Sequence, residues 1–136
     1  MTFDQIILTL LLLGIFTMIF GSVYFLPILF AKIKSQKFGL KLDFKQAHFL
    51  AKNKCLKKDF LIGLKEIWNI YPIELDKLIS HYYAGGNLEN LKVGISEMKL
   101  RNKEPDLVML TALDLINRDL KIEVEKAANN EWKFEL

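Results

Sequence analysis

The chain has 136 residues, of which 51% are hydrophobic, and its formal net charge at pH 7 is +3. It holds a single cysteine, Cys55, which excludes an intrachain disulfide and a cysteine metal cluster. About 105 residues follow the apolar N-terminal run, enough for one small domain with its own core.

The N-terminal segment carries no charge from Ile6 to Ala31. Because about 20 apolar residues suffice to cross a bilayer as a helix, we predict a membrane anchor over residues 1–35. A cleavable signal peptide would need a positive start, a shorter apolar core and a small-x-small cleavage site. Here the only charge before the run is Asp4, and no such site follows. The residues expected to face lipid are Ile6, Leu13, Phe20, Phe25 and Phe30.

Lysines follow the anchor directly and set its expected orientation. Residues 32–58 hold nine lysines and one acid, whereas residues 59–136 hold ten basic and fourteen acidic residues. Because positive flanks stay cytoplasmic, we expect the N-terminus outside and the remaining chain inside. Residues 36–58 form a basic juxtamembrane amphipathic segment, and lysines at anionic head groups gain roughly 1 kcal/mol each. The predicted head-group collar consists of Lys32, Lys34, Lys37, Lys41 and Lys45.

Apolar residues recur at helical spacing after the anchor, and no segment favours a strand. The last two helices are expected after Pro105 and after a cap at Asp119, with Leu107, Leu110, Leu113 and Ile116 inward in the first of them. Short loops favour antiparallel hairpins. We therefore predict an all-α fold, in which a single transmembrane helix precedes a small cytoplasmic bundle of short helical hairpins. Residues 59–136 form its helical interaction domain. Helices are expected near residues 44–51, 60–68, 74–84, 88–98, 107–116 and 120–127.

Two sequence shifts suggest an internal repeat. A shift of 32 residues places Leu75 on Leu107 and Asn87 on Asp119. A shift of 33 places residues 42–43 on 75–76 and residues 48–49 on 81–82. These matches predict three helix-pair units with a polar cap in each connection, which is typical of a stacked scaffold.

Residues 78–88, LISHYYAGGNL, resemble the bacterial flotillin-like family of membrane-anchored scaffold proteins, in which a helix ends in a His-Tyr-x-Ala-Gly-Gly pattern before a polar cap. Residues 112–120 are similar to that family's Ala-Ile-Asp-Leu-Ala-Gly-Arg-Asp-Val segment. The resemblance implies scaffolding at a bacterial inner membrane and no chemistry. Family members continue into a stomatin/prohibitin/flotillin domain near the position of Leu136, so we expect a truncated relative. The implied structural or interaction motif comprises His81, Tyr82, Ala84, Gly85, Gly86, Asn87, Asp114, Arg118 and Asp119.

The polar residues give little sign of catalysis. No Ser, Cys or carboxylate stands at a recognisable catalytic spacing from His81, so we expect it to pack or cap a helix end. Two isolated histidines, His48 and His81, do not make a metal site. Residues 85–86 lack the pattern of a phosphate loop and predict a left-handed helix cap. We expect a protein that is not an enzyme and holds no cofactor or metal.

Three polar residues near the C-terminal end, Asp114, Arg118 and Asp119, are expected to form a local ion pair and a helix cap at a solvated helix end. Beyond them, Trp132 and Phe134 are expected either to cap the bundle or to dock onto a partner.

We therefore predict a membrane-anchored helical scaffold or adaptor that organises partner proteins at the inner membrane face. Its expected partners are membrane lipids and a protein or further copies of itself, with a full-length flotillin-like protein as one candidate. An accessory subunit of a membrane complex is an alternative. A membrane-bound helix-turn-helix regulator over residues 75–98 is another, but Lys92 and Lys99 are balanced there by Glu89 and Glu97, so we expect no nucleic acid.

Overall fold

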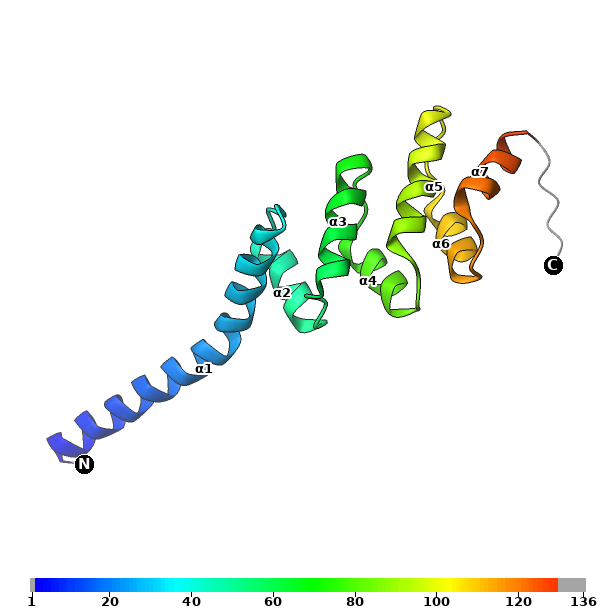
Figure 1. Cartoon of the computed structure of the whole chain (residues 1–136). Coiled ribbons are helices and arrows are strands. Elements are labelled where there is room, and N and C mark those ends of the chain that lie inside the picture. The colour runs from blue at the N-terminus through cyan, green and yellow to red at the C-terminus, as the bar shows by residue number, and fades with distance from the viewer. Residues whose placement is uncertain (1, 130–136) are drawn as a thin grey trace. The chain divides into compact units, whose positions relative to one another are not determined.

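The computed structural model describes residues 2–129, which form seven helices and no strand (Figure 1). The predicted all-α class is confirmed, and the six helices predicted after the anchor correspond to α2 through α7. The chain divides into two compact units, unit 1 from Met1 to Leu56 and unit 2 from Lys57 to Leu136. The helices are α1 (Phe3–Lys37), α2 (Phe44–Lys52), α3 (Lys58–Ile70), α4 (Leu75–Tyr83), α5 (Leu88–Leu100), α6 (Leu107–Leu115) and α7 (Leu120–Ala128).

Helix α1 is long and apolar enough to cross a membrane. None of its most apolar 18-residue window is buried, which distinguishes it from the core helix of a globular protein. A signal sequence near the N-terminus passes the same test of length and composition. All five residues predicted to face lipid are exposed. Pro27 lies inside the helix, and Figure 1 shows α1 bending partway along its length, as expected where proline removes a backbone hydrogen bond.

The end of α1 belongs to the packed part of unit 1. Ile28, Ala31 and Ser35 are buried, and α1 packs against α2. Asp43 begins α2 as its N-cap, where its side chain accepts a hydrogen bond from the backbone N–H of Gln46 at 2.6 Å. The last turns of the uncharged run therefore pack against protein, whereas its earlier turns are exposed.

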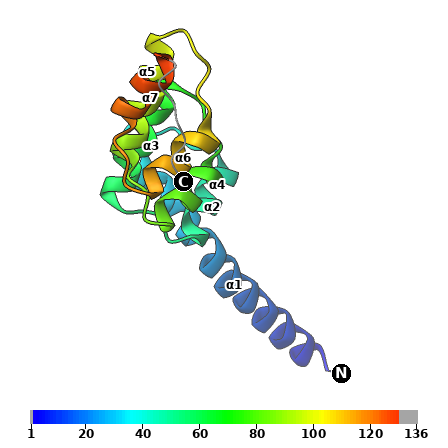
Figure 2. The same ribbon diagram turned by 90° about the vertical axis from the view of Figure 1, so that its right-hand side faces the viewer.

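Unit 2 is built in two layers. Helices α3, α5 and α7 lie side by side, with α5 in the middle, and α4 and α6 lie in a second layer (Figure 2). Two glycines allow close approach in the first layer. A Cβ atom at Gly63 would lie 2.8 Å from Leu88, and one at Gly94 would lie 2.9 Å from Leu120. The first leucine of α5 thus packs against the glycine of α3, and the first leucine of α7 packs against the glycine of α5. Fully buried core residues include Phe60, Leu61, Leu64, Ile67, Leu91, Ile95, Leu110 and Leu120.

The repeat at 32 residues is present in unit 2. Helices α4 and α6 begin at Leu75 and Leu107, and α5 and α7 begin after their N-caps Asn87 and Asp119. The correspondence at 33 residues is wrong. It pairs Asp43, an N-cap, with a residue inside α4, because α2 and α4 begin 31 residues apart rather than 33.

The same backbone turn ends α2, α4 and α6. Lys54, Gly85 and Asn117 each have positive φ, and the next residue's N–H donates to a carbonyl five residues earlier. This is the Schellman cap, which satisfies carbonyls that the helix end leaves free. The predicted left-handed cap at residues 85–86 is therefore confirmed, with φ of +92° at Gly85.

The prediction that Ile116 faces inward is wrong. Ile116 is 63% exposed, whereas Leu110 is fully buried. Helix α6 stops after nine residues and Ile116 is its C-cap, so the helical period that predicted an inward position ends before this residue. Leu107 and Leu113 are half-buried.

Candidate functional site

Asp114 lies at the centre of a buried polar junction in unit 2. Its side chain is 1% exposed and that of His81 is 2% exposed, and His81 Nε2 lies 2.8 Å from Asp114 Oδ2. The prediction of a solvated helix end at Asp114 is therefore wrong. The carboxylate points inward from the last turn of α6 toward the turn between α4 and α5, where buried donors need an acceptor.

The Asn87 backbone and the Asn90 side chain complete this junction. Asp114 accepts hydrogen bonds from the backbone N–H of Asn87 and from the Asn90 side chain, both at 2.6 Å. The Asn90 amide also donates to the Arg118 carbonyl, and its oxygen accepts from the Leu120 N–H. The network therefore joins the ends of α4 and α6 to the starts of α5 and α7.

The His81 ring packs against the glycine turn rather than facing solvent. A Cβ atom at Gly86 would overlap the His81 ring. Within the described residues, neither ring nitrogen has a well-directed hydrogen-bond partner, so the approach of Nε2 to Asp114 is close but poorly aligned. A general base must reach a proton on its substrate. Because both groups are shielded from solvent, the pair suits the joining of helices, in line with the structural role predicted for His81.

Asp119 has the capping role predicted for it, whereas Arg118 does not form the predicted ion pair. Asp119 caps α7 by accepting from the backbone N–H groups of Lys121 and Ile122, as predicted. The predicted local ion pair is wrong, because the Arg118 guanidinium lies 4.0 Å from Glu123 instead, on a side chain that is 56% exposed. Asn87 caps α5 through its side-chain oxygen, which was also predicted.

Tyr82 connects α4 to the first turn of α3. Its hydroxyl donates to Asp59 Oδ2 at 2.7 Å, and its ring meets that of Phe60 edge-on at 5.1 Å. Lys57 lies over the same ring. The hydrogen bond from Tyr82 lowers the pKa of Asp59 below its ordinary value, because it favours the ionised carboxylate. Ala84, the last member of the predicted motif in this helix, is exposed at the C-cap.

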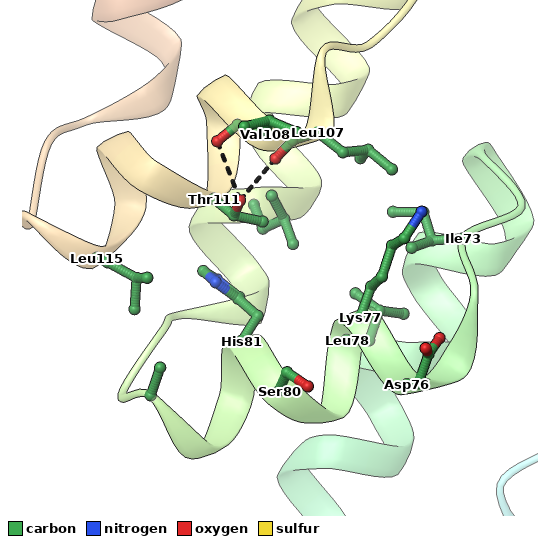
Figure 3. A pocket seen from close by; sticks show the side chains of 12 residues that line it. Ile73, Asp76, Lys77, Leu78, Ser80, His81, Leu107, Val108, Thr111 and Leu115 are labelled. Atoms are coloured by element: carbon green, nitrogen blue, oxygen red, sulfur yellow. Dashed lines mark hydrogen bonds between the residues drawn. The ribbon is translucent and has the colours of Figure 1, made fainter.

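A largely apolar groove of about 470 Å³ lies between α4 and α6 (Figure 3). Figure 3 shows His81 on the α4 side, with Thr111 opposite it on α6. The Thr111 hydroxyl donates to the carbonyls of Leu107 and Val108, so it is occupied within its own helix. The apolar lining consists of Ile73, Leu78, Ala84, Leu91, Leu107, Val108 and Leu115.

Two exposed apolar residues of the groove lie on α6. Val108 is 81% exposed and Leu115 is 41% exposed. The charged residues Asp76 and Lys77 lie on the α4 side, where Lys77 pairs with Glu74 at 3.0 Å. An apolar strip bordered by charges is the usual composition of a protein-binding surface.

The lysine collar in unit 1 is only partly free. Lys37, Lys41 and Lys45 are exposed, whereas Lys32 and Lys34 are half-buried, and Lys34 lies over the Phe30 ring. The two predicted docking residues, Trp132 and Phe134, lie outside the described residues.

Sequence reasoning missed Asn90 and Val108. Asn90 stands three residues after the cap Asn87, in a helix start where a second polar residue has an ordinary place, and its partners lie 24 to 30 residues away. Val108 follows a helical pattern that does not tell an inward from an outward apolar residue. Among residues 2–129, no three His, Cys, Asp or Glu side chains gather closely enough to hold a metal ion.

Comparison with known proteins gave no match. No family model, curated protein or solved structure matches this chain. The resemblance to the flotillin-like family therefore stays a prediction drawn from residues 78–88 and 112–120.

Proposed function

We propose that this protein is a membrane-anchored helical adaptor, related to the bacterial flotillin-like scaffolds, which holds a protein partner at the inner membrane face. The observation that carries the proposal is the apolar groove between α4 and α6, where Val108 is 81% exposed. Val108 adjoins the other apolar residues of the groove, so a partner that covers it would gain about 1.5–3 kcal/mol from burying this side chain.

The membrane half of the proposal is supported by α1. Its apolar side chains are exposed all round from Ile6 to Phe25, which water penalises and lipid does not. The exposed lysines Lys37, Lys41 and Lys45 follow on one flank only. That asymmetry favours an N-terminus outside and unit 2 in the cytoplasm.

The proposed occupant of the groove is an amphipathic helix of a protein partner. Apolar residues three and four apart on such a helix would contact Leu107, Val108 and Leu115, and its polar face would meet the charged rim at Asp76 and Lys77. The backbone N–H and C=O groups of a helix are hydrogen-bonded to one another, so a helix can be buried in this groove without leaving them unpaired.

The packing of α5 disfavours the helix-turn-helix alternative. A recognition helix must present one face freely to the major groove. Helix α5 lies between α3 and α7, and Lys92 is engaged by Glu66 and Glu89. Lys99 binds the Ile70 carbonyl. The lysines that would contact phosphate are thus already engaged within unit 2.

The experiment that tests this function is crosslinking from the groove in native membranes. A photo-crosslinking residue at position 108 of the full chain is expected to give a discrete protein adduct. The matched control is position 100, because Leu100 is 76% exposed in unit 2 and is not part of the groove. The adduct should form from position 108 and not from position 100.

Groove variants make the same test quantitative. Val108→Asp is expected to lower recovery of the crosslinked or co-purified partner about tenfold or more, because a charge replaces buried apolar area, whereas Leu100→Asp leaves it unchanged. An adduct of twice the chain's mass identifies the partner as a second copy, and a stoichiometric set of membrane proteins identifies an accessory subunit. Equal recovery with both variants contradicts binding in the groove.

A further inference from the structure

The start of α2 lies level with the uncharged part of α1. The rings of Phe25 and Phe44 have centroids 5.2 Å apart. Lys32 is the first lysine of the chain and follows Phe25 by seven residues, or about 10 Å along a helix. The beginning of α2 therefore reaches about 10 Å back past the end of the apolar run.

That position is too polar for the hydrocarbon of a bilayer. Asp43 caps α2, and Lys41 and Lys45 on either side of it are exposed. An ionised side chain at the membrane centre costs about 3 kcal/mol or more. The hydrocarbon must therefore end at or before the level of Phe25.

The remaining apolar residues of α1 have a protein environment instead. Ile28 and Ala31 are 6% and 0% exposed where α1 packs against α2, so they are shielded from lipid. The uncharged segment from Ile6 to Tyr24 is about 28 Å long at 1.5 Å per residue. This length matches the roughly 30 Å of bilayer hydrocarbon without residues 25–31.

We propose that α1 leaves the hydrocarbon at Phe25 and that α2 makes a second contact with the membrane, in which Phe44 enters the interface and Lys41 and Lys45 bind anionic head groups. This inference rests on the proposed anchoring by α1. Phe44 is 48% exposed and touches Phe25, which continues the lipid-facing surface of α1. Aromatic rings favour the interface, and adjacent lysines favour anionic lipid over zwitterionic lipid.

The test is the membrane depth of single spin labels on the full chain in vesicles of phosphatidylcholine and phosphatidylglycerol. Cys55 is first replaced by alanine, and labels are placed singly at Leu13, Phe30, Phe44 and Val108. The label at Leu13 is expected in the hydrocarbon and the label at Val108 in water. The label at Phe44 is expected at the head-group level, protected from a water-soluble nickel relaxant relative to Val108.

The label at Phe30 distinguishes a hydrocarbon boundary at Ala31, where the uncharged run ends, from the proposed boundary at Phe25. It belongs to the uncharged run and is 60% exposed, so a boundary at Ala31 places it in the hydrocarbon, accessible to oxygen and protected from nickel. The boundary at Phe25 places it on the aqueous side, accessible to nickel. A Phe30 label in the hydrocarbon, or a Phe44 label as accessible to nickel as Val108, overturns this inference and leaves the anchor intact. A water-exposed Leu13 label overturns the anchor as well.

Charge reversal tests the head-group contact. Lys41→Glu with Lys45→Glu is expected to raise nickel accessibility at position 44 severalfold in anionic vesicles. The matched control, Lys58→Glu with Lys65→Glu, changes two exposed lysines of unit 2 and should leave that accessibility unchanged. Equal effects of the two pairs, or the same depth at position 44 in purely zwitterionic vesicles, overturn the role of the lysines.

Discussion

Helix α1 and unit 2 both expose apolar side chains, but they do so in opposite patterns. From Ile6 to Phe25 the exposed apolar residues surround α1 on all sides. In unit 2 the exposed aliphatic residues are scattered over the surface, and two of them, Val108 and Leu115, line a groove. Exposure all round a helix fits a fluid apolar solvent, whereas exposed apolar residues that line a groove fit a shaped partner. The same side-chain chemistry thus supports lipid anchoring in one region and protein binding in the other.

The largest effect is expected from charges placed in α1, and it tests whether lipid surrounds this helix. Leu13→Arg with Phe16→Arg places two charges near the middle of the proposed span and is expected to cost about 6 kcal/mol of insertion free energy. The variant should be extracted from membranes by alkaline carbonate. Leu13→Ala with Phe16→Ala is the control and should stay in the membrane pellet. Retention of the arginine variant contradicts a lipid environment for α1.

The next effect concerns the buried junction of unit 2. Asp114→Ala leaves the Asn87 N–H and the Asn90 amide without their acceptor, which is expected to cost about 2–4 kcal/mol in the free energy of unfolding. Asp119→Ala removes an exposed cap and should cost about 1 kcal/mol. Urea unfolding of the full chain in detergent measures both. Equal losses contradict the buried role of Asp114, and membrane retention should be unchanged in both variants.

Gly86→Ala tests the packing of the His81 ring in the same junction. The new methyl group overlaps the ring, so the expected loss is about 1–3 kcal/mol. The loss should shrink when His81 is already alanine, because the space is then free. Gly85→Ala is the control for backbone strain, since φ there is positive but a Cβ atom meets nothing within 4 Å. Additive losses from Gly86 and His81 argue against their contact.

The smallest effect is the pH dependence of the bond between Tyr82 and Asp59. Because the folded state lowers the pKa of Asp59, its stabilisation is present above the ordinary carboxyl pKa and is lost as the pH falls through the folded value. Tyr82→Phe should cost less than about 1 kcal/mol at pH 7, as is usual at an exposed site. The difference from the wild type should vanish in strong acid. A difference that persists there would mean that the Tyr82 hydroxyl stabilises the fold independently of the ionised Asp59 carboxylate.

Helical periodicity and polar caps were sufficient to predict the all-α fold, because both are local in the sequence. Asn87 and Asp119 cap helices as their residue types suggest. The end of α6 was not predicted correctly. Ile116 was therefore expected to face inward, although it is the C-cap and lies outside the core. Where a helix stops depends on the turn that follows, and here Asn117 supplies positive φ without a glycine to mark it.

The candidate site was only partly predictable for a different reason. His81, Asn87 and Asp114 were recognised as members of a motif, but their meeting in a buried junction depends on the packing of α6 against α5. The asparagine that completes the junction, Asn90, has partners 24 to 30 residues away. The groove likewise arises from the spacing of α4 and α6, which no local pattern encodes.

Protease accessibility of the tagged full chain in intact and opened bacterial cells tests the central claim most directly. If α1 stays in the inner membrane with unit 2 on the cytoplasmic side, unit 2 will resist added protease until the membrane is opened, and α1 will remain in the membrane fraction. Digestion of unit 2 from outside intact cells, or a freely soluble mature protein that lacks α1, would contradict the account.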